Sequence, residues 1–176
     1  MIVLASALAL LASGCGGSKS AEEKWSDSVC SAVGDWQDTV DQSVNDVQTQ
    51  LQSPSTGMMA SINASIQSAV DATKKLSSDL RSLDPPNSDA GKQAQQQVTS
   101  LSNQLDQTVT TTKDTVGNIP AGAGVTTIAK QLATLVPSLQ TLATSASNTL
   151  SAIQASAQAF KDGFAKADSC KQYRSG

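Results

Sequence analysis

The sequence predicts an all-α fold, an antiparallel up-down-up-down four-helix bundle with coiled-coil-like packing, and three observations lead to this prediction. Apolar residues recur at alternating spacings of three and four along four stretches, which is typical of amphipathic helices. Segments that contain proline or glycine separate these stretches. Alanine, serine, threonine and glutamine flank the narrow apolar stripes, as expected where only heptad positions a and d are buried.

The composition favours one packed domain that does not bind nucleic acid. The chain has 176 residues, which is a usual size for a single domain. Aromatic residues make up only 3%, but apolar residues make up 39% and recur periodically, so we expect a core rather than disorder. The net charge of −3 argues against a nucleic-acid partner, because such a partner requires a basic surface that neutralises phosphates.

The first three predicted helices end at segments that contain helix breakers. These segments are residues 53–57, 84–87 and 118–124. We expect the helices to stop there because proline lacks a backbone donor and glycine has no side chain that favours the helix. The three stripes are Trp25, Val29, Val33, Trp36, Val40, Val44, Val47 and Leu51, then Met58, Ile62, Ile66, Val70, Thr73, Leu76, Leu80 and Leu83, then Ala94, Val98, Leu101, Leu105, Val109, Thr112, Val116 and Ile119.

The fourth stripe is too long for a single helix of this bundle. As one helix it would span about 65 Å, against about 40–47 Å for the others. A proline inside a helix removes a hydrogen bond and clashes one turn back, so we predict that the last helix is kinked or broken near Pro137, at residues 133–136. A final helix from about residue 137 to 168 follows. The stripe consists of Val125, Ile128, Leu132, Leu135, Leu139, Leu142, Ala146, Leu150, Ile153, Ala157, Phe160, Phe164 and Ala167.

The amino-terminal residues resemble a lipoprotein signal. Residues 2–12 form an apolar run with the length of a signal-peptide h-region, too short to span a bilayer. The sequence "LASGC" that ends at Cys15 resembles the bacterial lipobox, although no lysine or arginine precedes the apolar run. The resemblance implies cleavage before Cys15, a diacylglyceryl group on its thiol and an acyl chain such as palmitate on its amine. The alternative is an ordinary secretory signal with a chance match.

These features divide the chain into four segments. We expect residues 1–14 to be a cleaved signal peptide, residues 15–21 a lipidated tether, residues 22–170 the helical bundle and residues 171–176 a C-terminal tail. The expected location is the outer face of the bacterial plasma membrane. Two or three acyl chains on Cys15 would hold the protein there stably.

An odd number of cysteines in an exported chain requires an explanation. If Cys15 carries lipid, Cys30 and Cys170 remain, near the two ends of the mature chain and in a compartment where disulfides persist. A disulfide across that separation would stabilise the fold by about 5 kcal/mol in the chain-entropy model. Two free thiols, or a disulfide to another chain, are the alternatives.

The same pair predicts a register between the first and last helices, which are neighbours in an up-down-up-down bundle. If the disulfide sets the register, the numbers of facing residues sum to about 200. Nearly every resulting pair is apolar. The pairs are Val33 with Ala167, Trp36 with Phe164, Val40 with Phe160, Val47 with Ile153 and Leu51 with Leu150.

This register gathers Trp36, Phe160 and Phe164 into one aromatic layer near the disulfide and the membrane. The layer is interpreted as core, because large rings fill space that small residues leave. A ligand pocket at the layer is the alternative. Trp25 either continues the stripe of the first helix or rests at the bilayer interface.

The sequence offers no recognisable catalytic site, and we expect the protein not to be an enzyme. Histidine is absent, which removes the imidazole base and any histidine-liganded metal. Two cysteines alone do not complete a metal site. Asp35 and Asp38 could share a helix face as a weak cation site, but an acidic solvated face is the simpler interpretation. No metal and no cofactor are therefore predicted.

The mature chain is similar to small exported helical lipoproteins of actinobacteria. The resemblance rests on the lipobox, on the composition rich in Ala, Ser, Thr, Asp and Gln, and on the "CSAVGDWQ" opening. We expect a non-catalytic, lipid-anchored interaction or scaffold module, with an envelope protein as its partner. The alternatives are a carrier that opens around an apolar ligand and a phage- or plasmid-type exclusion or immunity lipoprotein.

Overall fold

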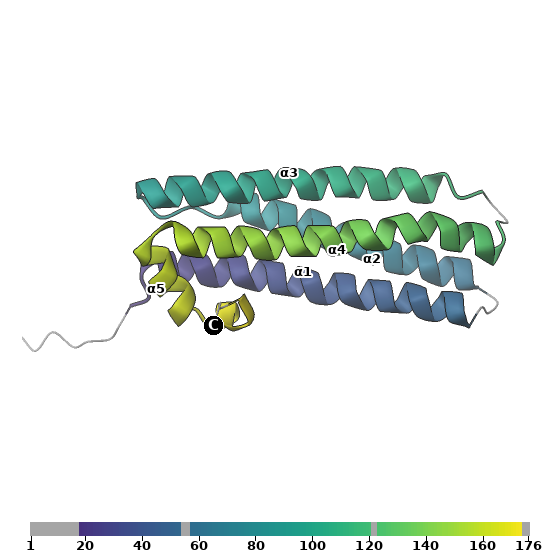
Figure 1. The fold of residues 1–176 in the computed structure, drawn as a ribbon, viewed down its shortest axis with the longest axis horizontal. Helices are drawn as coiled ribbons and strands as arrows, with labels where there is room; N and C mark the ends of the chain where they lie inside the picture. Colours follow the sequence, from purple (N-terminus) through teal and green to yellow (C-terminus); the bar gives the residue numbers. More distant parts are fainter. Residues whose placement is uncertain (1–17, 54–56, 121–122, 174–176) are drawn as a thin grey trace, which may run out of the picture.

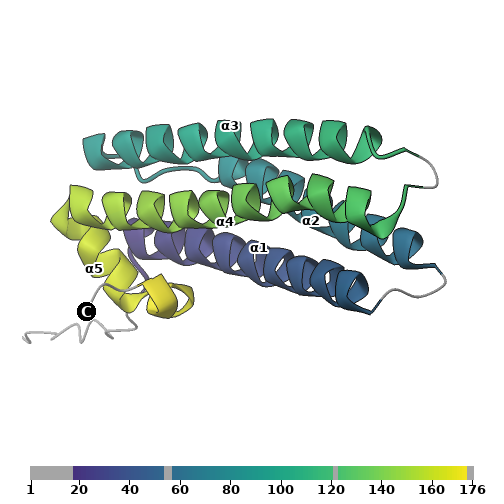
Figure 2. The ribbon, with the colours of Figure 1, turned by 45° about the vertical axis from the view of Figure 1, so that its right-hand side comes forward.

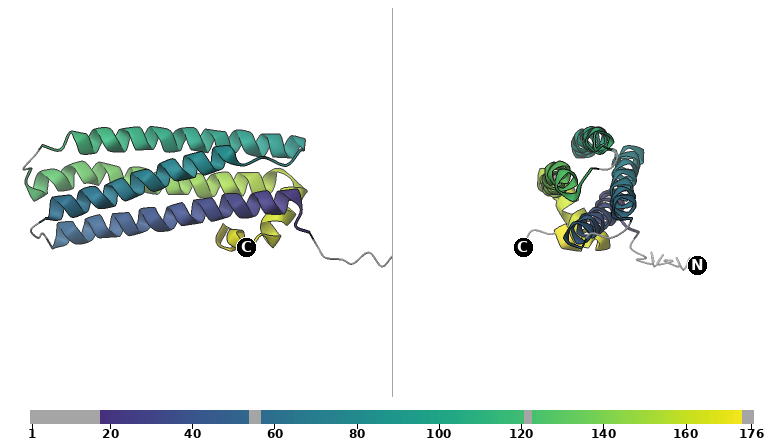
Figure 3. Two further views of the ribbon diagram at one scale, coloured as in Figure 1. Left: turned by 180° about the vertical axis from the view of Figure 1, so that it is seen from behind. Right: turned by 90° about the vertical axis from the view of Figure 1, so that its right-hand side faces the viewer.

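The computed structural model describes residues 18–53, 57–120 and 123–173. It confirms the all-α prediction: four long helices follow one another in antiparallel order, and no strand occurs in these residues (Figure 1). The long helices are α1 (Ala21–Gln52), α2 (Met58–Ser82), α3 (Asp89–Gly117) and α4 (Val125–Ser156). A short helix α5 (Gln158–Lys166) and a 3-10 helix η1 (Asp168–Tyr173) complete the described chain. Viewed along the bundle, the four long helices surround a common axis (Figure 3).

Local signals fix where the helices begin. The hydroxyl of Ser20 accepts the N–H of Glu23 at 3.0 Å, and the hydroxyl of Ser88 accepts the N–H of Gly91 at 3.0 Å, so serine caps both α1 and α3. Gly57 precedes α2 with a φ of 90°, a left-handed conformation that favours glycine. The apolar stripes of all four helices then face inward, and Val125 is the one large apolar side chain that remains exposed among the described residues.

The predicted break at Pro137 is wrong. Helix α4 continues through Pro137, from Val125 to Ser156, and has the same length of 32 residues as α1. Pro137 and Ala133, whose carbonyl would accept the N–H that proline lacks, are both exposed. Water can therefore replace the missing hydrogen bond, and the helix tolerates the proline on its solvent face.

The break occurs instead at Ala157, where the backbone is extended, with a φ of −157° and a ψ of 149°. The hydroxyl of Ser156 donates to the carbonyl of Ile153 at 2.7 Å and closes the last turn of α4. Helix α5 then crosses beside the start of α1, and η1 follows along the same helix (Figure 2). Residues 171–173, assigned from sequence to the C-terminal tail, form the end of η1.

The predicted pairing between the first and last helices is also wrong. Gln37 of α1 donates from Nε2 to the hydroxyl of Ser147 on α4 at 3.3 Å, whereas the predicted register puts Gln37 opposite Gly163. Gly163 lies instead against the backbone of Glu22 and Glu23. The prediction assumed an uninterrupted helix up to the disulfide. Because the chain turns at Ala157, the disulfide sets the position of η1 and not the register of α4.

The core falls into two clusters along the bundle. The base, defined as the end that carries the start of α1 together with α5 and η1, holds the larger cluster, which includes every buried aromatic side chain and both described cysteines. The distal end carries the α1–α2 and α3–α4 connections. Its cluster is smaller and has only aliphatic and methionine side chains, Val47, Met58, Ile62, Ile128, Leu132 and Leu135.

Candidate functional site: the disulfide-linked base

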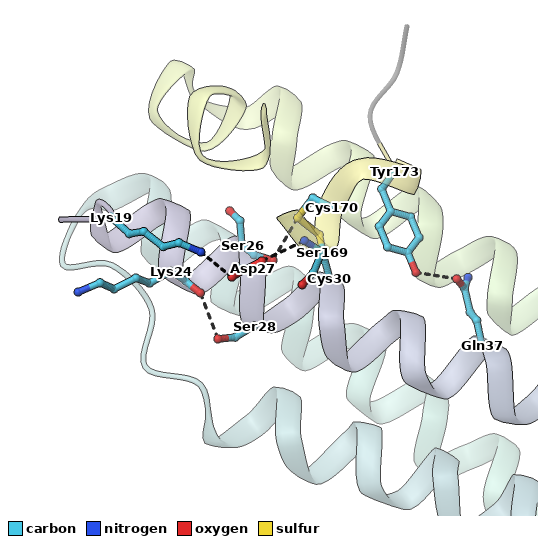
Figure 4. Close-up of a disulfide and its surroundings, with 10 residues drawn as sticks. All are labelled: Lys19, Lys24, Ser26, Asp27, Ser28, Cys30, Gln37, Ser169, Cys170 and Tyr173. Carbon is cyan, nitrogen blue, oxygen red and sulfur yellow. Dashed lines mark hydrogen bonds and ion pairs between the residues drawn. A yellow bond between two sulfur atoms is a disulfide. The ribbon is translucent and has the colours of Figure 1, made fainter. Parts of the chain in front are cut away.

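The predicted disulfide between Cys30 and Cys170 is present at the base (Figure 4). It joins α1 to η1 across 140 residues of sequence, with a Cα–Cα distance of 5.1 Å. Both cysteines are fully buried, and the Sγ atom of Cys170 also lies 3.2 Å from the carbonyl oxygen of Ser26. A disulfide without solvent contact is poorly accessible to attacking thiolates, which is typical of a structural crosslink.

Asp27 forms a second link between α1 and η1. Its Oδ1 accepts the N–H of Ser169 at 3.0 Å, and its Oδ2 forms an ion pair with Nζ of Lys19 at 3.0 Å (Figure 4). The Ser169 N–H and the Lys19 ammonium hold the pKa of this carboxyl below its usual value. One carboxylate thus ties the residues that precede α1 and the start of η1 to the same turn of α1.

Tyr173 forms a third link. Its hydroxyl donates to Oε1 of Gln37 at 2.6 Å, and Nε2 of Gln37 donates onward to Ser147, so the contact connects η1, α1 and α4. Partial burial of the phenol raises the pKa of Tyr173 to about 12, because the charged phenolate loses solvation there. Sequence analysis missed this link and that of Asp27, because each pairs residues more than a hundred positions apart without an apolar pattern.

The aromatic side chains do not form the predicted single layer. Trp25, rather than Trp36, packs against Phe160, with ring centroids 5.4 Å apart in an edge-to-face arrangement. Trp36 lies three turns further along α1, about 16 Å away, and donates from Nε1 to the hydroxyl of Thr73 at 3.0 Å. Phe164 is fully buried at the base. Trp25 is only 4% exposed, so its ring belongs to the core and not to a bilayer interface.

Helix α5 crosses the first turn of α1 at a glycine. A Cβ on Gly163 would lie 3.0 Å from the backbone carbon of Glu22 and 3.1 Å from the backbone nitrogen of Glu23. Such a distance is closer than ordinary van der Waals contact, so a side chain at this position would push the two helices apart. The crossing lets Phe160 and Phe164 close the end of the core beneath α1.

The candidate carboxylates of α1 form none of these links, although, after the larger effect of burial, their charges contribute to the raised pKa of Tyr173. Asp35 and Asp38 are both exposed. In the part of the chain that the structure describes, no group of three or more His, Cys, Asp or Glu side chains is arranged to hold a metal ion. No described helix is long and apolar enough to cross a membrane. Cys15 and the predicted signal peptide lie outside the described residues.

The base therefore brings together four of the predicted site residues, Cys30, Cys170, Phe160 and Phe164, and adds three that sequence analysis did not select, Asp27, Ser169 and Tyr173. Each contact joins the beginning of the bundle to its end. The arrangement holds the beginning of α1 and the end of the described chain together. Neither a family model, nor a curated protein, nor a solved structure matches this chain.

Proposed function

We propose that this protein is a non-catalytic, lipid-anchored module of the bacterial cell envelope that serves interaction or scaffolding on the outer face of the plasma membrane. The observation that carries the proposal is the position of Cys15 in the lipobox-like "LASGC" sequence, five residues before the residue that caps α1. Five extended residues reach at most about 17 Å, so an acylated Cys15 would keep the base close to the membrane.

The links at the base support an anchoring role for this end. The disulfide, the Asp27 ion pair and the contact of Tyr173 all involve residues of α1 between Asp27 and Gln37. Because the two terminal segments of the domain are joined at this end, an anchor attached here would hold the whole bundle at the membrane. Helices of 32 residues extend about 48 Å, so the distal end would stand far from the membrane surface.

The surface charge supports an interaction role without chemistry. The exposed face of α1 carries Asp35, Asp38, Asp41 and Asp46, whereas α4 carries no charged residue after Lys130. Faces that differ in this way can distinguish among partners, because like charges repel and uncharged polar faces do not.

Membrane attachment is tested with Cys15→Ala, with Ser18→Ala as the matched control. The proposal predicts that the parent chain and Ser18→Ala sediment with membranes and that Cys15→Ala is released. Mass spectrometry of the tryptic peptide that ends at Lys19 should show cleavage before Cys15 and an added diacylglyceryl group. Sedimentation of Cys15→Ala with membranes, or an unmodified Cys15 peptide, would refute the anchor.

The interaction role is tested by crosslinking in intact envelopes. We expect one specific crosslinked partner that is lost when Asp38 and Asp46 are both changed to lysine and retained when Lys161 on α5 is changed to glutamate. Circular dichroism of each variant checks that the bundle is folded. A crosslinking pattern that is the same for all three proteins would contradict an interaction through the acidic face of α1.

A further inference from the structure

The distal half of the bundle contains a small inner cavity with an apolar wall, which is partly open to solvent. The cavity has a volume of about 30 Å³ and lies where the base cluster and the distal cluster meet. All four long helices contribute to its wall, and the wall is almost entirely apolar. The lining includes Val44 and Val47 of α1, Ala69 of α2, and Leu132, Leu135 and Leu139 of α4. Its size suits about one methyl or methylene group.

A larger groove lies outside this cavity, between α2 and α3. It has a volume of about 600 Å³, within the range of small-molecule sites. Its apolar lining includes Met59 and Val70 of α2 and Val116 and Ile119 from the end of α3 and the segment that follows. Three of these four residues, all except Val70, are only half-buried, so the groove offers apolar surface that the bundle itself leaves partly uncovered.

Ile66 of α2 lines both the inner cavity and the outer groove. Its half-buried side chain is therefore the partition between them. A single apolar chain that lay along the groove and passed Ile66 would reach the interior, whereas the other lining residues belong to one space or to the other. The shared residue makes the two spaces parts of one candidate site.

One charged residue lines this site. Lys113 of α3 is exposed and lies on the groove, whose other polar lining consists of the amides of Asn63 and Gln67. Asp71 of α2 forms an ion pair with Lys74 of its own helix at 3.4 Å. A hydrogen bond from Gln67 and the charges of Lys74 and Lys113 hold the pKa of Asp71 below its usual value, so Lys113 has one acidic neighbour and remains exposed. A ligand that fills the apolar groove and carries one negative charge would match both the lining and Lys113.

We propose that the distal half binds a slender apolar chain with an anionic end group, such as a long-chain carboxylate. The chain lies in the groove between α2 and α3, its far end passes Ile66 into the inner cavity, and its anionic group rests at Lys113. This site goes beyond the proposed envelope role, because binding at the distal end does not depend on the anchor.

The experiment uses the full chain with Cys15→Ala and its disulfide formed, so that no acyl chain of its own competes. The probe is palmitic acid with a diazirine at the end of its chain, and the uncharged comparison is the corresponding alcohol. Photocrosslinking at increasing probe concentration gives the half-saturation point, and peptide mapping gives the site. We expect crosslinks in the tryptic peptides 25–74 and 131–161, which contain the parts of the cavity wall that come from α1, α2 and α4.

Three variants give effects of different sign. Ala69→Val fills the inner cavity and should raise the probe concentration at half-saturation about tenfold. Ala64→Val on the exposed face of α2 should leave that concentration unchanged. Ile66→Ala removes the partition and should tighten binding by about threefold, although it lowers the stability of the fold. Lys113→Gln should weaken binding of the acid by about fivefold and leave the alcohol unaffected.

The proposal is overturned if the probe does not saturate, or if its crosslinks map only to the peptide that ends at Lys19, which would show adsorption to the amino-terminal apolar run. It is also overturned if Ala69→Val and Ala64→Val behave alike, or if Ile66→Ala weakens binding. Any of these results leaves the test of membrane attachment untouched, since that test depends on Cys15 alone.

Discussion

The base and the distal half of this bundle are built from the same four helices but are held together in different ways. At the base, a disulfide and side-chain hydrogen bonds join segments that are far apart in sequence, and an ion pair adds the residues that precede α1. Among the described residues of the distal half, apolar packing is the main contact between the helices, several aliphatic side chains remain half-buried, and a small cavity lies between the helices. The difference indicates that the crosslinked base stabilises the fold, whereas the less tightly packed distal half can rearrange its side chains.

The largest expected effect comes from removing the disulfide. Replacing both Cys30 and Cys170 by serine should lower the free energy of unfolding by about 5 kcal/mol in the chain-entropy model, because the unfolded chain regains the freedom of a long loop. Urea unfolding followed by circular dichroism measures the loss. If the base owes its integrity to packing alone, the double variant will unfold within about 1 kcal/mol of the parent.

Matched leucine truncations compare the two clusters directly. Leu150 is fully buried in the base cluster, and Leu135 is 5% exposed beside the distal cavity, both on α4. We expect Leu150→Ala to cost about 4 kcal/mol and Leu135→Ala about 2.5 kcal/mol, because a site next to a cavity relaxes more easily. Equal losses in urea unfolding would mean that the two clusters are packed equally well.

The crossing of α5 over α1 can be tested with a single methyl group. Gly163→Ala should destabilise the protein by about 1–3 kcal/mol, since its Cβ would press on the backbone of Glu22. Gly117→Ala at the end of α3 is the control, because a Cβ there meets nothing within 4 Å. Thermal unfolding of the two variants should separate clearly, and a shared midpoint would show that α5 is not held tightly at the base.

The decrease in the free energy of unfolding at acid pH should depend on the contacts of Asp27. Its pKa is lowered in the folded protein, so its contribution is present above the unfolded value of 3.8 and is lost as the pH falls through the folded pKa. We expect Asp27→Asn to remove about 1 kcal/mol at pH 7 and nothing below the folded pKa. Unfolding at a series of pH values checks this, and a constant difference at every pH would contradict it.

The smallest expected effect is that of Tyr173 on the free energy of unfolding at alkaline pH. Its folded pKa of about 12 lies above the ordinary value of 10.0 for a tyrosine, so its contribution is complete below pH 10 and declines as the pH rises towards the folded value. Tyr173→Phe should cost about 0.5–1 kcal/mol at pH 8 through the lost hydrogen bond to Gln37. Urea unfolding at pH 8 and pH 11 should show a smaller difference between parent and variant at the higher pH.

The two halves also differ in how far their structure could be predicted from sequence. The stripes of Val, Ile and Leu that fill the distal cluster are local patterns, and periodicity alone placed them inside. No proline or glycine marks the turn at Ala157. The turn depends instead on tertiary packing, in which Phe160 and Phe164 close the end of the core. Pro137 is a strong local signal for the end of a helix, but α4 continues through it because the proline lies on the solvent-exposed face.

The candidate site shows the same division. The pairing of Cys30 with Cys170 could be predicted because cysteines are few and chemically distinct. The partners of Asp27 and Tyr173 could not, since aspartate and tyrosine have many alternative partners in any fold. The inner cavity results from how side chains of four helices fail to meet around Ala69, and no pattern within one helix encodes such a gap.

The crosslink at the base also has a mechanical consequence. Cys30 and Cys170 close the residues between them into a covalent ring, and this ring contains α2, α3 and α4 entirely. A force applied between the two ends of the chain therefore passes from the beginning of α1 through the sulfur–sulfur bond into η1. Helices α2, α3 and α4 are bypassed by that force, whereas the turns of α1 before Cys30 carry it. An enzyme that unfolds proteins by pulling on one end would have to thread a closed loop.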